Sequence, residues 1–324
     1  MFTTDVDISV IIVNWNSADF VQKCVRSLDE HTRGVSMEIV VLDSGSFDGC
    51  GEMLAREFPR VRFIQSDKNL GFARGNNQAA KSAAGRFLVF LNPDTELRGP
   101  ALDKLFEAAV SFPKAGALGA HLLNSDGTLQ TSCLQSFPTI ANQVLDAELL
   151  RKWFPRSRLW GVAPLYANVL VSVEVEGISG ACLMTPRALF EQVGGFNEDY
   201  FMYYEDMDYC MKIHKAGWKN YYVPSAVIVH HGGKSSGGEH SKFSSVMMAE
   251  SGWRFFRTQR GVAQAAMFRA CLAAKAASRT CVLGLLSLAP VSEARRKWIK
   301  SALGKWSCVL RWAFGGEKEI ANLR

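Results

Sequence analysis

Four short runs rich in apolar residues mark the first third of the chain. They cover residues 8–13, 38–42, 61–65 and 87–91, and segments with helical spacing separate them. Apolar runs of this length are typical of strands covered on both faces, and strands that alternate with helices pair in parallel through right-handed crossovers. The pattern predicts an α/β fold with a mostly parallel central sheet flanked by helices.

Each predicted strand ends in a polar cluster. Asn14 follows the first strand, Asp43 the second, residues 67–69 the third, and Asn92 with Asp94 the fourth. Parallel strands place these ends along one edge, where open α/β sheets bind ligands. Amide and carboxylate groups there suit the base and ribose of a nucleotide. Any single member could instead cap the helix that follows it.

The segment 86–96 (RFLVFLNPDTE) has the sharpest change from apolar to polar. Pro93 lacks an N–H and cannot continue a central strand, so we expect Asp94 on a turn just past the strand end. A carboxylate there could hold Mg²⁺ or Mn²⁺, which also bridges phosphate oxygens. Asn-Pro-Asp-Thr is also ordinary turn chemistry, so a capping role for Asp94 stays open.

Positive charge and a turn follow the third predicted strand. Lys68 could meet a phosphate, and the turn at Asn69 and Gly71 could aim backbone N–H groups of a helix start at it. The chain has no glycine fingerprint after the first strand and no Walker lysine motif. Dinucleotide oxidoreductases and P-loop enzymes are therefore poor matches.

The second half of the pattern is less regular. It predicts a helix over 99–112, a strand over 115–123, a variable region over 131–171 that meets the acceptor or fills the core, and a strand-like stretch over 173–185. Two further strands, over 221–223 and 226–229, lead to His230. Histidine there is either an ordinary polar residue or a metal ligand opposite Asp94.

The most acidic segment contains Glu205, Asp206 and Asp208. They fall in the first turn of a predicted helix, where the helix dipole favours carboxylates and can account for them. The same arrangement suits a general base, since a partly desolvated aspartate with like-charged neighbours has a raised pKa.

Six motifs, in their order and spacing, resemble the family-2 glycosyltransferases of the GT-A fold, and within them the bacterial rhamnosyltransferase-like branch. The resemblance covers roughly residues 7–232, and the motifs read VIIVNWNS, VVLDSGSFDG, DKNLGFARGNN, FLNPDT, ISGACLMTPRALFEQVGGFNEDYFMYYEDMDYCMKIHKAGW and VIVHHGG. It implies an inverting transfer of a sugar, first of all L-rhamnose from dTDP-rhamnose, from a nucleoside diphosphate to a hydroxyl of a saccharide acceptor in cell-surface polysaccharide assembly.

The resemblance also implies roles for individual residues. Asp43 would bind the donor's base or ribose, Asp94 and His230 would hold Mg²⁺ or Mn²⁺, and Asp206 of the Glu205 and Asp206 pair would remove the acceptor proton. The remaining donor-binding candidates are Asn14, Lys68, Asn69, Gly71 and Asn92. Many relatives have aspartate in place of Asn92, so the metal here has one fewer anionic ligand.

Two other classes stay open. A sugar nucleotidyltransferase shares the nucleotide-binding sheet, but it should carry a Gly-rich, Arg-containing phosphate loop where this chain has NWNS. A non-catalytic, membrane-associated protein that binds nucleotide sugars is the other alternative. The presence of both Asp94 and Asp206 disfavours it.

Composition adds a division between two predicted domains. The net charge of the 324 residues is +6, yet residues 253–324 alone hold 14 Lys/Arg against 3 Asp/Glu. We expect a catalytic domain over 1–240 and a basic, helical extension over 241–324. Eight scattered cysteines and the lack of a cleavable leader at the N-terminus favour the cytoplasm.

The tail suggests a membrane surface as partner. Its longest uncharged run, residues 280–292, is too short to span a bilayer. Residues 293–314 have Trp298, Ile299, Trp306 and Val309 at helical spacing, which suits a helix in the membrane interface or one packed on protein. We expect residues 253–324 to bind the inner face of the cell membrane, where a polyprenyl-diphosphate-linked acceptor would lie, and no nucleic-acid partner.

Overall fold

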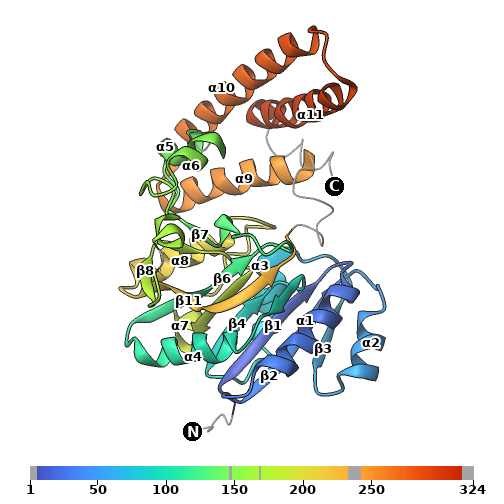
Figure 1. The fold of residues 1–324 in the computed structure, drawn as a ribbon, viewed down its shortest axis with the longest axis vertical. Coiled ribbons are helices and arrows are strands. Elements are labelled where there is room, and N and C mark those ends of the chain that lie inside the picture. Colours follow the sequence, from blue (N-terminus) through green and yellow to red (C-terminus); the bar gives the residue numbers. More distant parts are fainter. Residues whose placement is uncertain (1–5, 146–147, 168, 233–241, 316–324) are drawn as a thin grey trace. The chain divides into compact units, whose positions relative to one another are not determined.

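The computed structural model describes residues 6–145, 148–167, 169–232 and 242–315. The chain forms two compact units. The N-terminal unit comprises Met1–Phe137, Glu148–Phe201 and Glu205–Ser236, and the C-terminal unit comprises Pro138–Ala147, Met202–Tyr204 and Gly237–Arg324. Figure 1 labels most of the helices and strands of both.

The first half of the N-terminal unit has the predicted alternation of strands and helices. It runs β1 (Ile8–Asn14), α1 (Ala18–His31), β2 (Met37–Ser44), α2 (Cys50–Glu57), β3 (Arg62–Ser66), α3 (Gly71–Ala80) and β4 (Phe87–Leu91). β1 pairs in parallel with both β2 and β4, and β2 pairs in parallel with β3. The predicted parallel pairing is confirmed for these four strands.

The second half adds strands of both directions. It contains β5 (Thr95–Leu97), α4 (Ala101–Ser111), β6 (Ala115–Leu123), β7 (Leu134–Gln135), α6 (Glu148–Trp153), β8 (Val173–Val175), β9 (Gly177–Ile178), β10 (Cys182–Pro186), α7 (Arg187–Gln192), α8 (Glu205–Lys215) and β11 (Lys219–His230). The main sheet has the order β3-β2-β1-β4-β10-β6-β11-β5, with β8 beside β11. β10 runs antiparallel between β4 and β6, so the sheet is mixed.

Three details differ from the sequence pattern. The strand-like stretch 173–185 is broken into β8, β9 and β10, and the two strands expected before His230 form the single strand β11. Pro224 lies between the two expected strands, and β11 accommodates it in an irregularity of pairing between Val223 and Val227. The short strand β5, directly after Asp94, gave no signal because it has only three residues.

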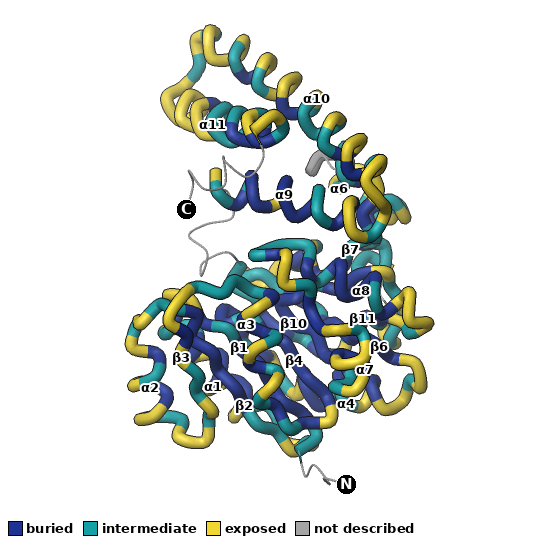
Figure 2. Tube along the Cα trace, turned by 180° about the vertical axis from the view of Figure 1, so that it is seen from behind, coloured by how far each residue is buried: buried dark blue, intermediate teal, exposed yellow. Residues whose placement is uncertain are grey.

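Helices cover both faces of the sheet. Ile8, Val10 and Ile12 of β1 pack in one core cluster with the buried faces of α1, α2 and α4. Ile11 of the same strand belongs to a second cluster with residues of α3, α7 and α8. Figure 2 shows the strands as buried and the outer turns of the helices as exposed. Alternate side chains of one strand thus enter two cores, which explains why the four consecutive residues 10–13 are all apolar.

The C-terminal unit is helical. It consists of α5 (Ile140–Val144), α9 (Lys242–Gln259), α10 (Val262–Ser287) and α11 (Glu293–Gly315). Ile299, Val309 and Trp312 on α11 are buried, and the indole Nε1 of Trp312 donates to Glu250 of α9 at 2.8 Å. The packed alternative therefore holds for this face of α11.

Helix α10 is longer than its uncharged run suggested. It has 26 residues with a mean hydropathy of 1.2 in its most apolar window, and by length and composition alone it is able to cross a membrane. The length expected from the sequence was shorter because only the uncharged run of residues 280–292 was considered. The apolar part of α10 also includes Lys275 and Arg279.

The short segment Met202–Tyr204 belongs to the C-terminal unit, although both of its chain neighbours belong to the other unit. Ser251 Oγ donates to the carbonyl oxygen of Met202 at 2.7 Å, and the Tyr204 hydroxyl donates to Gln143 Oε1 at 2.6 Å. Tyr203 and Tyr204 have φ values of 71° and 66°, in the left-handed region that residues with a side chain rarely adopt. These contacts offset the strain of that backbone.

Candidate active site

The strand registers bring the predicted polar clusters to one edge of the sheet. Asn14 pairs with Asp43 across β1 and β2, and Asp43 pairs with Gln65 across β2 and β3. On the other side of β1, Ile11 pairs with Phe90, which places the end of β4 and the turn to Asp94 level with Asn14. The edge expected from sequence is therefore formed by β1, β2, β3 and β4 together.

Asp43 is buried and well supplied with hydrogen bonds. It accepts from Asn14 Nδ2 at 2.7 Å, from the backbone N–H and hydroxyl of Ser46, and from Gln65 Nε2 at 2.8 Å. Burial raises the pKa of Asp43, but these hydrogen bonds outweigh that effect and hold the pKa below its usual value. The carboxylate is therefore ionised and fixed in place at neutral pH.

A second carboxylate shares this network. Asp48 accepts from Asn14 Nδ2 at 3.1 Å and from the backbone N–H of Ala18, at the start of α1, at 2.9 Å. Asn14 thus joins two anions at the end of β1. Sequence reasoning missed Asp48, although its place in the DSGSFDG motif was a usable signal.

Asp94 and His230 lie together, as predicted. Asp94 follows β4, His230 ends β11, and the Nε2 atom of His230 is 3.3 Å from Oδ1 of Asp94. The backbone N–H of His231 also donates to the carbonyl oxygen of Asp94 at 2.9 Å. Asp94 is 1% exposed, yet among the described residues no hydrogen bond reaches either of its carboxylate oxygens.

The tautomer of His230 follows from its neighbour Gln130. Gln130 donates its amide hydrogens to Asn124 Oδ1 at 3.0 Å and to the carbonyl oxygen of His230 at 3.4 Å. This orientation leaves Gln130 Oε1 to accept from Nδ1 of His230, 2.7 Å away. In the neutral imidazole this arrangement leaves the lone pair on Nε2, which faces Asp94 and lies 3.2 Å from Asn92 Nδ2.

This pair suits a divalent cation. A buried carboxylate that accepts no hydrogen bond is costly, and a cation between it and the Nε2 atom 3.3 Å away would offset that cost. Imidazole nitrogen and carboxylate oxygen are both ligands of Mn²⁺-type ions. In the described ranges, no group of three or more His, Cys, Asp or Glu side chains is arranged to hold a metal, so other ligands would have to come from a substrate, water or Asn92.

The Glu205 and Asp206 pair begins α8, and a short chain of contacts connects it to the same edge. The N–H of Asn92 donates to the carbonyl oxygen of Ala181 at 3.0 Å, and the N–H of the preceding residue, Gly180, donates to Oδ2 of Asp206 at 2.9 Å. Only two adjacent residues therefore separate Asp206 from the turn that carries Asp94. His230 and Asp206 both come to this edge from elements far along the chain.

Both carboxyl groups have raised proton affinity. Burial raises the pKa of Asp206 against the opposing effect of hydrogen bonds from Gly180 and Met207. Burial and the charges of Asp206 and Asp208 raise the pKa of Glu205 well above its usual value. Glu205 is buried, whereas Asp206 keeps partial exposure. Asp206 is therefore the member of the pair that a second substrate can reach.

The third acidic residue has a structural place. Asp208 is buried, accepts from the hydroxyl of Tyr200 at 3.3 Å, and lies 3.6 Å from Nζ of Lys212 on the next turn of α8. Its partners tie α8 to the segment before it. Only Glu205 and Asp206 of this acidic cluster belong to the candidate site.

The predicted phosphate cradle at the start of α3 is wrong in its mechanism. The N–H of Leu70 donates to Ser44 Oγ at 2.7 Å, that of Gly71 to Asn69 Oδ1 at 2.9 Å, and that of Phe72 to the carbonyl oxygen of Phe201 at 3.0 Å. Because all three N–H groups already donate within the chain, none is free for a phosphate. Lys68, whose side chain is exposed, remains as a cation beside this turn.

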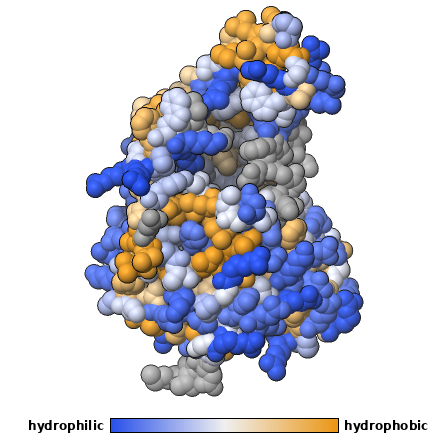
Figure 3. All heavy atoms as spheres, in the orientation of Figure 1, coloured by the Kyte–Doolittle hydropathy of each residue, from blue (hydrophilic) through white to orange (hydrophobic). Residues whose placement is uncertain are grey.

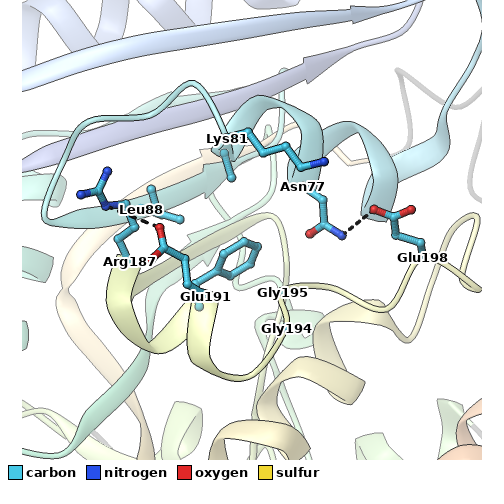
Figure 4. A pocket seen from close by; sticks show the side chains of 10 residues that line it. Asn77, Lys81, Leu88, Arg187, Glu191, Gly194, Gly195 and Glu198 are labelled. Carbon is cyan, nitrogen blue, oxygen red and sulfur yellow. Dashed lines mark hydrogen bonds and ion pairs between the residues drawn. The ribbon is translucent and has the colours of Figure 1, made fainter.

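A hollow of about 290 Å³ lies elsewhere in the N-terminal unit. Figure 4 shows Asn77 of α3 and Lys81, the residue after α3, facing Glu191 of α7 across it, with Asn77 hydrogen-bonded to Glu198. Leu88 at its wall is the second residue of β4, whereas Asp94 follows the end of that strand. The hollow is therefore distinct from the edge that carries the carboxylates.

Comparison with known proteins assigns the family. The profile of glycosyl transferase family 2 matches residues 9–192. The N-acetylglucosaminyl-diphospho-decaprenol L-rhamnosyltransferase of Mycobacterium tuberculosis is 33% identical over 77% of this chain and 87% of its own length. Rhamnosyltransferase WbbL of Escherichia coli is 23% identical over 68% of this chain and 82% of its own length.

The fold has known counterparts as well. A mannosyltransferase from Pyrobaculum calidifontis, solved in complex with GDP-Man and Mn²⁺, superposes with a TM-score of 0.53 at 19% identity, over 95% of this chain and 87% of that one. This likeness identifies the GT-A arrangement of sheet and helices. The profile over more than half of its length, together with the 33% identical relative, establishes that the chain belongs to glycosyl transferase family 2.

Proposed function

We propose that this chain is an inverting glycosyltransferase that moves L-rhamnose from dTDP-rhamnose to a hydroxyl of a lipid-linked saccharide. The observation that carries the proposal is the convergence of Asp43, Asp94 with His230, and Asp206 on one edge of the sheet. The sugar and the acceptor class are inferred from the 33% identical relative, which is named for both.

The donor nucleotide binds along the ends of β1, β2 and β3 in this proposal. Asp43 and Asn14 offer fixed acceptor and donor groups to the base and ribose, and exposed Lys68 offers positive charge to the diphosphate. Asn69 and Gly71 act indirectly, since their hydrogen bonds to Ser44 and to each other hold the turn beside Asp43. Because hydrogen bonds already hold these groups in place, they can orient a donor without losing further conformational entropy when it binds.

Asp94 and His230 hold the divalent cation. The unpaired carboxylate and the lone pair on Nε2 fit such an ion, and Gln130 keeps the imidazole in the tautomer that can bind it. Rotation of the Asn92 amide would present its oxygen in place of its nitrogen. A bound Mg²⁺ or Mn²⁺ would supply positive charge to the diphosphate that leaves during transfer.

Asp206 acts as the general base. It takes the proton of the acceptor hydroxyl as the oxygen attacks the anomeric carbon and the bond to the diphosphate breaks, which inverts that carbon. Its raised pKa brings it closer to the working pH, where a carboxylate accepts a proton more readily. The buried Glu205 favours its protonated form and so leaves the negative charge on Asp206.

The acceptor side points to a membrane. The relative with 33% identity acts on a decaprenol-linked substrate, according to its name, and residues 253–324 of this chain are strongly basic. We infer a peripheral enzyme at the cytoplasmic face of the cell membrane, where the basic C-terminal unit meets anionic lipid and the acceptor. The product would serve cell-surface polysaccharide assembly.

A transfer assay tests the proposal. The full chain, Mn²⁺ or Mg²⁺ and a polyprenyl-diphospho-GlcNAc acceptor are combined in turn with dTDP-rhamnose, UDP-GlcNAc and GDP-mannose. We expect a mass increase of the acceptor by one deoxyhexose with dTDP-rhamnose and inverted stereochemistry of the new bond by NMR. Transfer from a different donor alone would contradict rhamnose as the donor sugar. Retention of the anomeric configuration would contradict the general-base role of Asp206.

A further inference from the structure

Helices α10 and α11 form an antiparallel hairpin, in which the start of α10 packs against the end of α11. The apex of the hairpin is at the opposite end. Nε of Arg269, early in α10, donates to the carbonyl oxygen of Ala313 at 2.9 Å, late in α11. Further along, the guanidinium of Arg279 lies 5.4 Å from the ring of Trp306. The apex is therefore the end of α10, the start of α11 and the five residues between them (Figure 1).

The apex exposes large apolar side chains. Val282, Leu285 and Leu288 are 56%, 65% and 82% exposed, and Trp298 at the start of α11 is 61% exposed. Figure 3 shows apolar atoms gathered at the end of the hairpin where α10 gives way to α11. The buried face of α11, formed by Ile299, Val309 and Trp312, is used up inside the unit, so these apex residues form a separate surface.

Cations surround this apolar apex. Residues 262–315 contain nine Lys/Arg and one Glu. Lys297 of α11 is 3.1 Å from Glu293 in the same helix. Arg295 and Arg296 lie exposed in the first turn of α11, where the helix dipole favours anions and disfavours positive side chains. Stability of α11 does not explain that placement. An external negative charge at the apex does.

We propose that the α10–α11 apex inserts into the interface of an anionic lipid bilayer. Val282, Leu285 and Leu288 enter the boundary of headgroups and acyl chains, Trp298 lies at headgroup depth, and Arg295 with Arg296 contacts lipid phosphates. The exposed apolar side chains match the acyl-chain boundary of such an interface, and the arginines beside them match its phosphate layer. The inference deepens the proposed function, on which it rests for the lipid-linked acceptor, but vesicle binding itself requires no activity.

Insertion of the apex fits better than passage of α10 through the bilayer. Although α10 is long and apolar enough by composition, Phe268, Ala276 and Leu283 along it are buried in the C-terminal unit. Arg269 in the same helix is bonded to the end of α11. Spanning would require these contacts to break, whereas shallow insertion of the apex keeps them.

Vesicle co-sedimentation of the full chain without substrates tests the inference. The vesicles are phosphatidylcholine with or without phosphatidylglycerol. Val282→Ser with Leu285→Ser should lower binding about tenfold or more, and Arg295→Gln with Arg296→Gln should lower it about fivefold per cation on anionic vesicles only. Val110→Ser is the matched control, since Val110 is 51% exposed on α4 of the other unit, and it should leave binding unchanged.

Two further measurements keep the result decisive. Bromine-labelled lipid should quench part of the tryptophan fluorescence of the wild-type protein, and less of it in Trp298→Phe, which does not depend on the folding of the other variants. Equal vesicle binding by the wild type and all variants, or no quenching, would overturn the inference. So would a wild-type protein that does not bind vesicles but forms a dimer in light scattering, if the apex substitutions abolish that dimer. Failure of rhamnose transfer with intact vesicle binding would count only against the proposed function.

Discussion

Nε2 of His230 lies 3.3 Å from Oδ1 of Asp94, while Nδ1 on the opposite side of the ring lies 2.7 Å from Oε1 of Gln130. Asp94 is 1% exposed, and among the described residues neither of its carboxylate oxygens accepts a hydrogen bond. Asp94 directly precedes β5, which pairs antiparallel with β11 so that Thr95 stands opposite His230, although β10 and β6 separate β4 from β11 in the main sheet. Such a costly arrangement is expected at a functional site, where stability is sacrificed for binding.

Asp94→Asn should separate metal binding from stability. We expect dTDP affinity in the presence of Mn²⁺ to fall at least about tenfold, because a ligand is lost. The melting temperature should rise, because a buried carboxylate that accepts no hydrogen bond is removed. Calorimetric titration with and without Mn²⁺, together with thermal unfolding, measures both. Equal affinity for dTDP in wild type and variant under both conditions would contradict the metal role.

Gln130→Ala should weaken the same metal site indirectly, through the loss of its contact with His230. Without an acceptor at Nδ1, the imidazole of His230 loses its fixed tautomer, and we expect Mn²⁺-dependent dTDP binding to fall about 10- to 100-fold. Gln130→Glu keeps an acceptor oxygen and should restore most of it. The same loss in both variants would show that Gln130 acts through packing and not through the hydrogen bond to His230.

Asp206→Asn should lower turnover by about 10² to 10⁴ while donor binding stays intact. The amide retains the shape of the side chain but cannot accept the acceptor proton. Turnover and dTDP affinity are measured on the same preparations. In the wild type, activity should fall toward acid pH as the Glu205 and Asp206 pair takes up a proton, and the raised pKa places this fall above the range of an ordinary aspartate. More than about a tenth of wild-type turnover in the variant would exclude the base role.

Glu205→Gln should change the pH dependence of stability. The folded-state pKa of Glu205 is raised, so the folded protein binds more protons than the unfolded chain between about pH 4.3, the ordinary value, and the raised value. In that window the contribution of Glu205 to stability is lost as the pH rises. Denaturant unfolding at a series of pH values should show this decline in the wild type and a flatter profile in the variant. Parallel profiles would mean that Glu205 is not protonated in the folded protein.

Gly71→Ala and Gly127→Ala form a matched pair. Both glycines have positive φ, 71° and 80°, and only a Cβ at Gly71 would collide with neighbouring atoms, namely the carbonyl oxygen and ring of Phe201. We expect about 1 kcal/mol of destabilisation for Gly127→Ala from the backbone alone, and clearly more for Gly71→Ala. Urea unfolding of the two proteins compares them. Equal losses would show that the approach of Phe201 is loose.

The sequence predicted the parts of the site that lie on strand ends. The apolar runs defined β1, β2 and β4, and strand geometry then placed Asn14, Asp43 and Asp94 on one edge without knowledge of distant contacts. Gln130 and Gly180 escaped prediction because their roles depend on which side chain or carbonyl group meets them in the folded chain. The cradle at Gly71 failed for the same reason, since its N–H groups had local partners that spacing does not reveal. The apex of α10 and α11 was hidden because periodicity identifies an apolar face but not whether that face is packed.

The excursion of Met202–Tyr204 into the C-terminal unit makes clean separation of the two units by cutting the gene impracticable. A protein that ends before α9 would still contain two tyrosines in left-handed backbone, but would lack Ser251 and Phe255 that hold this segment. Glu205 and Asp206 come immediately afterwards in the chain. A shortened enzyme that had lost its activity would therefore say nothing about anchoring, because the same cut removes contacts that hold the segment directly before the proposed catalytic carboxylates.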